Sequence, residues 1–133
     1  MRKVATVAVG TAASLALGVS AHAAGDAAKG EAAFKAKCVI CHQIGAGAQN
    51  GVGPELNGIV GRKAASVASY ATYSAGMKKL GEEGYTWTEE NIDKWIANPK
   101  AMIPDSMMSL AFPGVPDAAE RADIIAYLKS ASK

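Results

Sequence analysis

Apolar residues recur at intervals of three and four in several segments of the chain, which is the spacing of one face of an α-helix. The clearest segment begins at Thr88, a residue type suited to cap a helix, and places Ile92, Trp95 and Ile96 on one face. The pattern stops at residues 98–99, where a proline disfavours helical backbone at the asparagine before it. The sequence therefore predicts an amphipathic helix between Thr88 and this stop.

Two more segments combine a helix-capping residue with helical spacing. One covers residues 27–37 after Asp26, and Phe34 is its single large apolar residue. The other begins at Asp117, with Glu120 three residues later in the pattern of a capping box. Its apolar positions are Ile124, Tyr127, Leu128 and Ala131. These segments predict the first and the last helix of the domain.

A shorter helix is expected over residues 74–80, with Gly81 as its C-terminal stop. The segments between the helices are loops, because residues 43–69 are rich in glycine, residues 98–116 are rich in proline, and no convincing strand alternation occurs. The sequence predicts an all-α fold with three main helices, a short one and long loops. Loops of this length in a small domain usually pack around something.

The first 23 residues have the organisation of a secretory signal peptide rather than of a folded domain. Arg2 and Lys3 precede an uncharged apolar run over residues 4–19, and small residues stand at Ala21 and Ala23. An uncleaved membrane anchor is the alternative, but the run is short for a bilayer. We expect cleavage near Ala23, export to the bacterial periplasm, and a mature domain over residues 24–133.

Removal of this segment changes the charge and the histidine content. The chain has 14 basic and 12 acidic residues, and without Arg2 and Lys3 the mature chain is close to neutral. A neutral domain of this kind does not indicate a nucleic-acid surface. The chain has two histidines, and because His22 leaves with the signal peptide, His42 is the only one in the mature chain.

Both cysteines of the chain lie in the sequence Cys38-Val39-Ile40-Cys41-His42. C-x-x-C-H is the attachment signal of c-type haem. On one helical turn both thiols lie on the same face, so each can add to one haem vinyl group and form a thioether. The adjacent imidazole can then bind the iron from the same side. The motif predicts one covalent haem c, attached through Cys38 and Cys41, with His42 as an iron ligand.

Three other uses of a cysteine pair fit the chain less well. A thioredoxin-like redox pair belongs in a βαβ context, which the pattern does not show. A zinc site needs further ligands, and the mature chain has no other cysteine or histidine. A structural disulfide is possible, but it explains neither His42 nor the glycine-rich loops, and closing so short a loop stabilises little.

The second axial ligand of the iron has to be a residue other than histidine. Histidine with methionine is the common pair in electron-transfer haems. The mature chain offers Met77, Met102, Met107 and Met108. Met77 falls on the predicted short helix and is expected to fill the core. The other three lie in the proline-rich loop, where rigid backbone could hold a ligand.

Five stretches in order resemble a known family. They are "GEAAFKAKCVICH", "GPELNGIVGRK", "YTWTEENIDKWIANPK", "IPDSMM" and "ERADIIAYLK". Together they resemble class I cytochrome c, in particular the bacterial cytochrome c2 and mitochondrial-like branch. The resemblance covers nearly the whole mature chain. It implies a small all-α fold wrapped around a covalent haem.

The resemblance also implies roles for single residues. The family's second iron ligand ends an I-P-G-T-K-M stretch, which implies Met108 here, with Met107 as the second candidate and Met102 as the third. Pro54 matches the proline whose carbonyl accepts a hydrogen bond from the axial histidine. The residues that match the groups around the inner haem propionate are Arg62, Tyr73 and Trp87. The residues that match the contact of the first and last helices are Gly30, Phe34 and Tyr127.

Two features depart from the family pattern. Trp95 stands where a tyrosine is usual near the methionine ligand, and an indole offers only a differently placed N–H. We therefore expect a shifted reduction potential of unspecified sign. Residues 108–112 make a segment about two residues longer than in the mitochondrial form. This leaves open whether Leu110 or Phe112 covers the exposed haem edge.

The implied function is that of a soluble, monomeric, periplasmic one-electron carrier, not an enzyme. The implied partners are membrane redox complexes that dock transiently: a bc1-type donor, and an oxidase, reaction centre or reductase as acceptor. The lysines expected near the haem edge are Lys35, Lys37, Lys63, Lys100 and Lys129. A haem enzyme or gas sensor with a labile methionine is the alternative, and a redox subunit dedicated to one dehydrogenase is a third possibility.

Overall fold

The computed structural model describes residues 24–132, so the predicted signal peptide of residues 1–23 lies outside the described residues. The helices, in chain order, are α1 (Ala27–Lys37), α2 (Ala75–Glu82), α3 (Glu89–Ala97), α4 (Pro99–Met102), α5 (Met107–Ala111) and α6 (Ala118–Ala131). Within residues 24–132 the only β-type pairing is an isolated bridge between Lys63 and Thr86. The prediction of an all-α fold is confirmed.

The three main helices begin at the capping residues that the sequence indicates. The Asp26 carboxylate accepts hydrogen bonds from the N–H groups of Ala28 and Lys29 at the start of α1. The Thr88 hydroxyl caps α3, and the Asp117 carboxylate caps α6. The Glu120 carboxylate lies 2.9 Å from Nζ of Lys37 on α1, so it links the two terminal helices.

Gly81 does not end α2, and the sequence-based prediction of a stop there was wrong. The helix continues through Gly81 to Glu82, and Gly84, with φ of +81°, is the glycine that leaves the helical conformation. A Cβ at Gly81 would lie 2.4 Å from the backbone oxygen of Ala64, so this glycine permits close packing against a loop. A glycine required for packing cannot be distinguished from a helix stop by pattern alone.

The proline-rich segment 98–116 is not a continuous loop, because it contains α4 and α5. The Asn98 side chain caps α4, and Pro99 occupies its first turn, where no backbone N–H is needed. The Ser106 hydroxyl caps α5 by accepting the N–H of Ser109 at 3.0 Å. Helices of four and five residues are too short to produce the apolar periodicity that the sequence prediction used.

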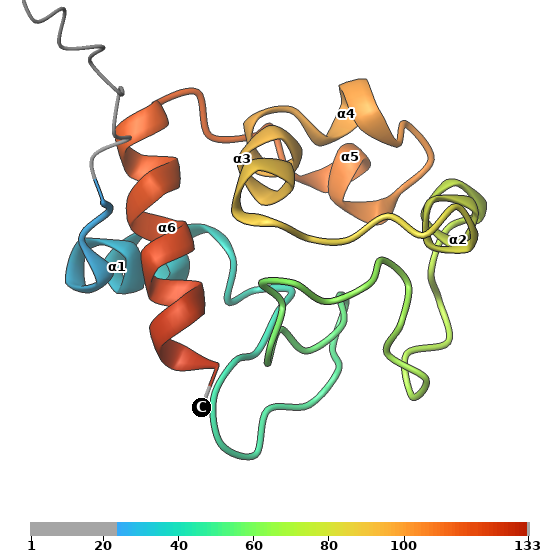
Figure 1. Ribbon diagram of the computed structural model, residues 1–133, viewed down its shortest axis with the longest axis horizontal. Coiled ribbons are helices and arrows are strands. Elements are labelled where there is room, and N and C mark those ends of the chain that lie inside the picture. Colours follow the sequence, from blue (N-terminus) through green and yellow to red (C-terminus); the bar gives the residue numbers. More distant parts are fainter. Residues whose placement is uncertain (1–23, 133) are drawn as a thin grey trace, which may run out of the picture.

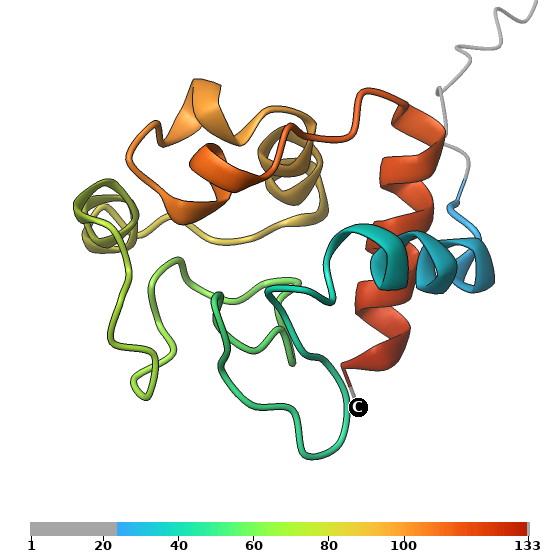
Figure 2. The same cartoon turned by 180° about the vertical axis from the view of Figure 1, so that it is seen from behind.

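Helices α1 and α6 cross in close contact, as both ribbon views show (Figures 1 and 2). A Cβ at Gly30 would lie 1.9 Å from the backbone oxygen of Asp123, so only glycine allows this approach. Beside it, the rings of Phe34 and Tyr127 meet at 5.3 Å with a tilt of 53°. The contact brings the beginning and the end of the domain together.

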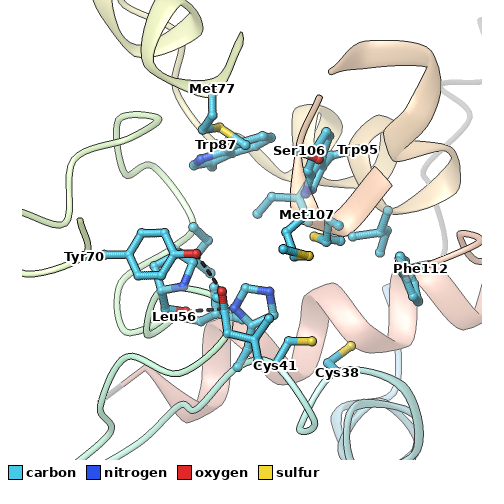
Figure 3. A pocket seen from close by; sticks show the side chains of 18 of the residues that line it. Cys38, Cys41, Leu56, Tyr70, Met77, Trp87, Trp95, Ser106, Met107 and Phe112 are labelled. Atoms are coloured by element: carbon cyan, nitrogen blue, oxygen red, sulfur yellow. Dashed lines mark hydrogen bonds between the residues drawn. The ribbon is translucent and has the colours of Figure 1, made fainter. Parts of the chain in front are cut away.

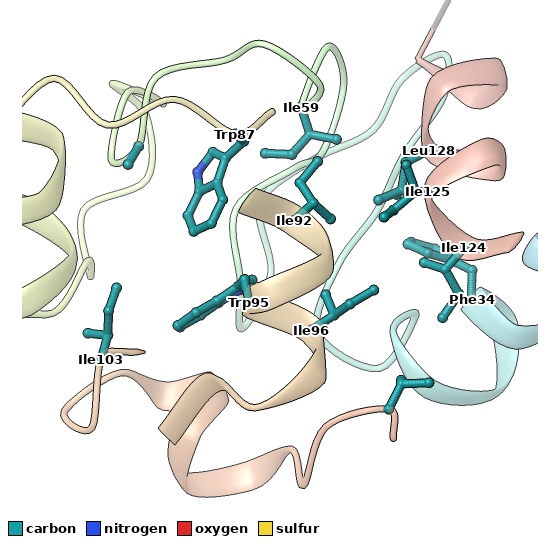
Figure 4. Packing of buried hydrophobic residues seen from close by; sticks show 12 residues of the cluster. Phe34, Ile59, Trp87, Ile92, Trp95, Ile96, Ile103, Ile124, Ile125 and Leu128 are labelled. Carbon is teal, nitrogen blue, oxygen red and sulfur yellow. The ribbon is translucent and has the colours of Figure 1, made fainter. Parts of the chain in front are cut away.

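The core joins α3 to the crossing of α1 and α6 (Figure 4). Helix α3 buries Ile92, Trp95 and Ile96, and α6 buries Ile124, Ile125 and Leu128. In the ribbon, α3, α4 and α5 lie together on one side, and the long loop that follows α1 lies opposite them (Figures 1 and 2). Across residues 24–132, no helix has both the length and the apolar character to span a membrane.

Candidate cofactor site

A cavity of about 300 Å³ lies between the loop that follows α1 and the group of α3 and α5. Its walls are mainly apolar and include Leu56, Ile59, Trp87, Ile92, Trp95 and Leu128. Both cysteines, His42 and three methionines also line it. Figure 3 shows the thiols of Cys38 and Cys41 on one wall and Met107 on the wall across from them.

The cysteine wall is one tight turn at the end of α1. Cys38 caps the helix and donates its N–H to the carbonyl of Phe34 at 2.8 Å. The N–H groups of Cys41 and His42 both donate to the carbonyl of Cys38, at 3.0 and 2.9 Å. This turn directs both thiols into the same cavity, and both cysteines are free (Figure 3). A planar cofactor in the cavity could therefore bond to both sulfurs along one of its edges.

The Cys38 thiol is not activated for redox exchange. Burial raises the pKa of the Cys38 thiol to about 11, because the thiolate would lose its solvation. Dithiol oxidoreductases need the opposite shift, since the thiolate is their nucleophile. The environment of this cysteine therefore opposes the thioredoxin-like alternative.

One ring nitrogen of His42 is held by the backbone. Nδ1 lies 2.8 Å from the carbonyl oxygen of Pro54, which fixes Nδ1 as the donor and leaves Nε2 for a metal. Burial lowers the pKa of the His42 imidazole, so the ring is neutral at neutral pH and can act as a ligand. A Cβ at Gly53 would lie 2.3 Å from Cε1 of His42, so the ring rests directly on the glycine backbone.

The structure separates the methionine candidates. Met107 and Met108 both line the cavity at the start of α5, and Met77 lines it from α2. Met102 lies instead at a separate small cleft with Leu80. The Met107 side chain is 56 % exposed, whereas Met108 is partly buried and packs against the core. The structure thus brings both adjacent methionines to the site, and Met108 is the more enclosed of the two.

The three residues expected around a propionate all line the cavity, but Arg62 has protein partners already. Its guanidinium donates to the Glu55 carboxylate at 3.3 Å and to the carbonyls of Asn57 and Glu55 at 2.9 and 2.8 Å. An arginine has five N–H donors, so these contacts leave two for another anion. Burial lowers the pKa of the Arg62 guanidinium, whereas the neighbouring Glu55 carboxylate favours its charged form.

Tyr73 and Trp87 form the rest of this wall. The Tyr73 hydroxyl accepts the N–H of Val67 at 3.2 Å, and burial raises the pKa of Tyr73, so the phenol keeps its proton as a donor. Trp87 is 6 % exposed and lies 5.7 Å from Trp95, ring centre to ring centre. The ring of Tyr70 meets Tyr73 edge-on at 4.7 Å, and its hydroxyl donates to the carbonyl of Val52 (Figure 3).

Sequence reasoning missed Gly53, Glu55 and Tyr70. Gly53 supports the histidine, Glu55 holds the arginine, and Tyr70 closes the loop over the cavity. Glu55 could have been noticed, because it is a charged residue between Pro54 and Leu56 in a largely apolar segment. Gly53 could also have been noticed, because it begins the quoted stretch "GPELNGIVGRK", whereas Tyr70 leaves no signal in a single sequence.

The residues present fit a c-type haem. Two thiols and a neutral imidazole stand on one wall, thioether sulfurs line the same cavity, and an arginine with free donors lies at its edge. The Gly53 backbone leaves room for the imidazole and for nothing larger than hydrogen at that position. Each part corresponds to one need of a porphyrin with an iron centre and charged propionates.

Comparisons with known proteins agree with this geometry. The sequence model of a family described as Cytochrome c matches residues 27–132. The chain is 50% identical over 104 residues to a cytochrome c2 of Agrobacterium tumefaciens (strain II Chrys), covering 78% of this chain and 90% of that protein. It is 47% identical over 116 residues to a cytochrome c2 of Rhodomicrobium vannielii, covering 87% of each chain.

The fold is also similar to a solved structure. Cytochrome cH from Methylobacterium extorquens superposes with a TM-score of 0.68 at 43% sequence identity. The match covers 80% of this chain and 99% of that chain.

Proposed function

Since this chain belongs to the cytochrome c family, we propose that it is a periplasmic carrier of single electrons whose haem iron is bound by His42 and Met108. The resemblance to class I cytochrome c and its cytochrome c2 branch is confirmed, and with it the expectation of haem c. The observation that carries the proposal is the placement of two thiols, His42 and the methionines around one cavity.

Different residues of the chain would attach, orient and hydrogen-bond the haem. Cys38 and Cys41 attach it, and the carbonyl of Pro54 holds His42 in the tautomer that leaves Nε2 for the iron. Arg62, Tyr73 and Trp87 supply donors for a propionate, which a buried carboxylate requires. When bound, the haem supplies an iron that exchanges one electron. Met108 fills the remaining position, so no site is left for substrate, and we propose no enzymatic activity.

The methionine ligand distinguishes the carrier from the alternative of a haem enzyme or gas sensor. A thioether raises the potential and keeps the iron low-spin in both oxidation states. Met108 is partly buried and packs against the core, which favours a ligand that stays in place. A sensor would need this side chain to leave readily.

Partner docking would use the candidate lysines together with exposed apolar residues, of which Ile40, Val52 and Met107 line the cavity. Three of the five candidate lysines form ion pairs within the chain: Lys35 with Glu31, Lys37 with Glu120, and Lys129 with Glu89. Lys63 lines the cavity itself. Among residues 24–132, the exposed large apolar residues are Val39, Ile40, Val52, Met107 and Leu110. We propose transient docking to membrane redox complexes, with a bc1-type donor and an oxidase, reaction centre or reductase as acceptor.

The test of this proposal is export followed by turnover. The full chain is expressed in a bacterium able to attach haem c, and the periplasmic fraction is analysed by mass spectrometry. We expect a chain beginning at Ala24 with one covalent haem, and rapid reduction by membranes that contain a bc1-type complex. The rate should fall modestly with salt, because most candidate lysines are already paired. Retention of the chain in the cytoplasm, or a reduction rate no faster than that of free haem, would refute the proposal.

A further inference from the structure

A single carboxylate connects the methionine-bearing segment to α2. Oδ1 of Asp105 lies 3.2 Å from the Ser74 hydroxyl, which caps α2, and Oδ2 accepts the N–H of Gly76 at 3.0 Å. Gly76 and Ser74 precede Asp105 by 29 and 31 residues in the sequence, so the contact is a tertiary one. A negative charge at the first turn of a helix is favourable, and hydrogen bonds to a carboxylate are stronger than those to a neutral acceptor.

The packing at this contact is tight on the helix side. A Cβ at Gly76 would lie 2.5 Å from Oδ1 of Asp105 and 2.7 Å from a methyl carbon of Ile103. Ile103 itself is 4 % exposed and belongs to the core. The absence of a side chain at Gly76 is therefore what lets residues 103–105 lie against the start of α2. In the ribbon, the connection from α4 to α5 extends toward α2 (Figure 1).

The residues that follow Asp105 form few hydrogen bonds to the rest of the protein, although Met108 and Phe112 pack against the core. Met107 and Met108 open α5, and α5 has no buried residue. Within the segment, the Ser109 hydroxyl donates to the carbonyl of Ile103, and Ser106 caps the helix. These bonds shape the turn but do not fix it to the rest of the protein. The segment is held to the rest of the protein by Ile103 in the core, by the packing of Met108 and Phe112 against that core, and by the hydrogen bonds of Asp105 to α2.

We propose that Asp105 is a positioning residue that fastens the methionine segment to α2 and keeps the second axial ligand on the iron. The inference rests on the proposed function, because it assumes that a methionine of α5 binds the iron. It does not depend on which of the two methionines does so. The motif of the family resemblance has glycine at this position, so the fastening belongs to this chain and not to the shared motif.

Binding of imidazole to the oxidised protein measures how often this segment opens. Added imidazole can reach the iron only when the methionine has left, so its apparent dissociation constant equals the intrinsic one divided by the open fraction. Titration is followed by loss of the sulfur-to-iron charge-transfer band. We compare the wild type with Asp105→Ala, Asp105→Asn and Gly76→Ala. The control is Asp26→Ala, which removes a carboxylate that accepts two N–H groups on α1.

Asp105→Ala should bind imidazole about tenfold more tightly than the wild type, because losing both hydrogen bonds raises the open fraction. Asp105→Asn keeps one acceptor and the shape, so a two- to threefold change is expected. Gly76→Ala should act like Asp105→Ala, since it separates the same surfaces. Asp26→Ala should lower the melting temperature yet leave imidazole affinity within about twofold of the wild type.

Different results would refute the positioning role of Asp105 and the proposed carrier function. If the wild type shows the charge-transfer band and Asp105→Asn, Asp105→Ala and Gly76→Ala all bind imidazole as the wild type does, the positioning role is wrong and the carrier function stands. The same holds if Asp26→Ala changes the affinity as much as Asp105→Ala, because the effect is then one of general stability. If the oxidised wild type lacks the band, the proposed ligand pair itself is wrong.

Discussion

The wall of the cavity that carries Cys38, Cys41 and His42 is fixed by backbone groups, whereas the wall that carries the methionines is fixed by side chains. On the first wall the Pro54 carbonyl holds the imidazole, and the N–H of Gly53 donates to the carbonyl of Cys41 at 2.8 Å. On the second wall, α5 is five residues long and is capped by a serine.

This difference assigns separate tasks to the two walls. In the proposed carrier, the first wall would hold the haem permanently, through Cys38, Cys41 and a His42 ligand whose orientation the main chain determines. The second wall would contribute a weak thioether ligand from α5, a helix in which no residue is fully buried. Disturbance of the protein should therefore release the methionine before the histidine. Segments with few buried contacts are the ones that open locally at low cost.

The largest expected effect comes from removing the covalent bonds of the first wall. The double variant Cys38→Ala/Cys41→Ala should lose covalent haem and with it the fold. Emptying an apolar cavity of about 300 Å³ costs about 7 kcal/mol at 24 cal/mol per Å³. That is comparable to the whole stability of a small domain. Haem staining after denaturing electrophoresis and far-ultraviolet circular dichroism provide the measurements. Haem that stays on the denatured double variant would contradict the assignment.

The next largest effect tests the second wall. Met108→Ala should abolish the sulfur-to-iron charge-transfer band, permit carbon monoxide binding to the reduced protein, and reduce stability by about 2–5 kcal/mol. Met107→Ala, the matched control from the adjacent position, should keep the band, because that side chain is 56 % exposed. The opposite result, in which only Met107→Ala loses the band, would assign the ligand to Met107.

A smaller effect probes the support of the histidine. Gly53→Ala places a methyl group against the His42 ring, which should tilt the imidazole and cost about 1–3 kcal/mol of stability in a denaturant titration. In the proton NMR spectrum of the oxidised protein, the resonances of the His42 ring, which the iron displaces, should change position as well. Gly51→Ala is the control, since its Cβ would meet only the Cys41 oxygen at 3.4 Å. Equal resonance shifts in both variants would remove the special role of Gly53.

The smallest effect concerns the charge beside Arg62. Glu55→Gln removes a partly buried carboxylate that favours the oxidised, more positive haem. The reduction potential should rise by about 20 mV. This corresponds to a roughly twofold change in the equilibrium constant for reduction, since 59 mV corresponds to a tenfold change. Spectroelectrochemical titration measures it, with the exposed Glu83→Gln as control. A fall in potential, or an equal rise in the control, would show that Glu55 does not act on the haem.

The first wall was more predictable from sequence than the second. The turn that presents Cys38, Cys41 and His42 is a contiguous motif with one dominant chemical use. The caps Asp26, Thr88 and Asp117 also give the correct starts of the main helices. In these places a few neighbouring residues determine the local structure.

The second wall depends on contacts between distant segments. Helices α4 and α5 are too short to leave a periodic pattern, and the role of Gly76 depends on Asp105, 29 residues away. The pattern at Gly81 predicts a helix stop, because the close packing of this glycine against Ala64 cannot be seen in sequence. The choice of Met108 over Met107 as the iron ligand stays a prediction, because both side chains line the same cavity.

The most direct test of the central claim, a closed haem with one ligand from each wall, is the visible spectrum of the purified exported protein. It is recorded oxidised, reduced, and reduced under carbon monoxide. We predict sharp low-spin bands, a sulfur-to-iron charge-transfer band in the oxidised form, and no response to carbon monoxide. A high-spin spectrum or ready carbon monoxide binding would mean an open iron and would contradict the carrier function.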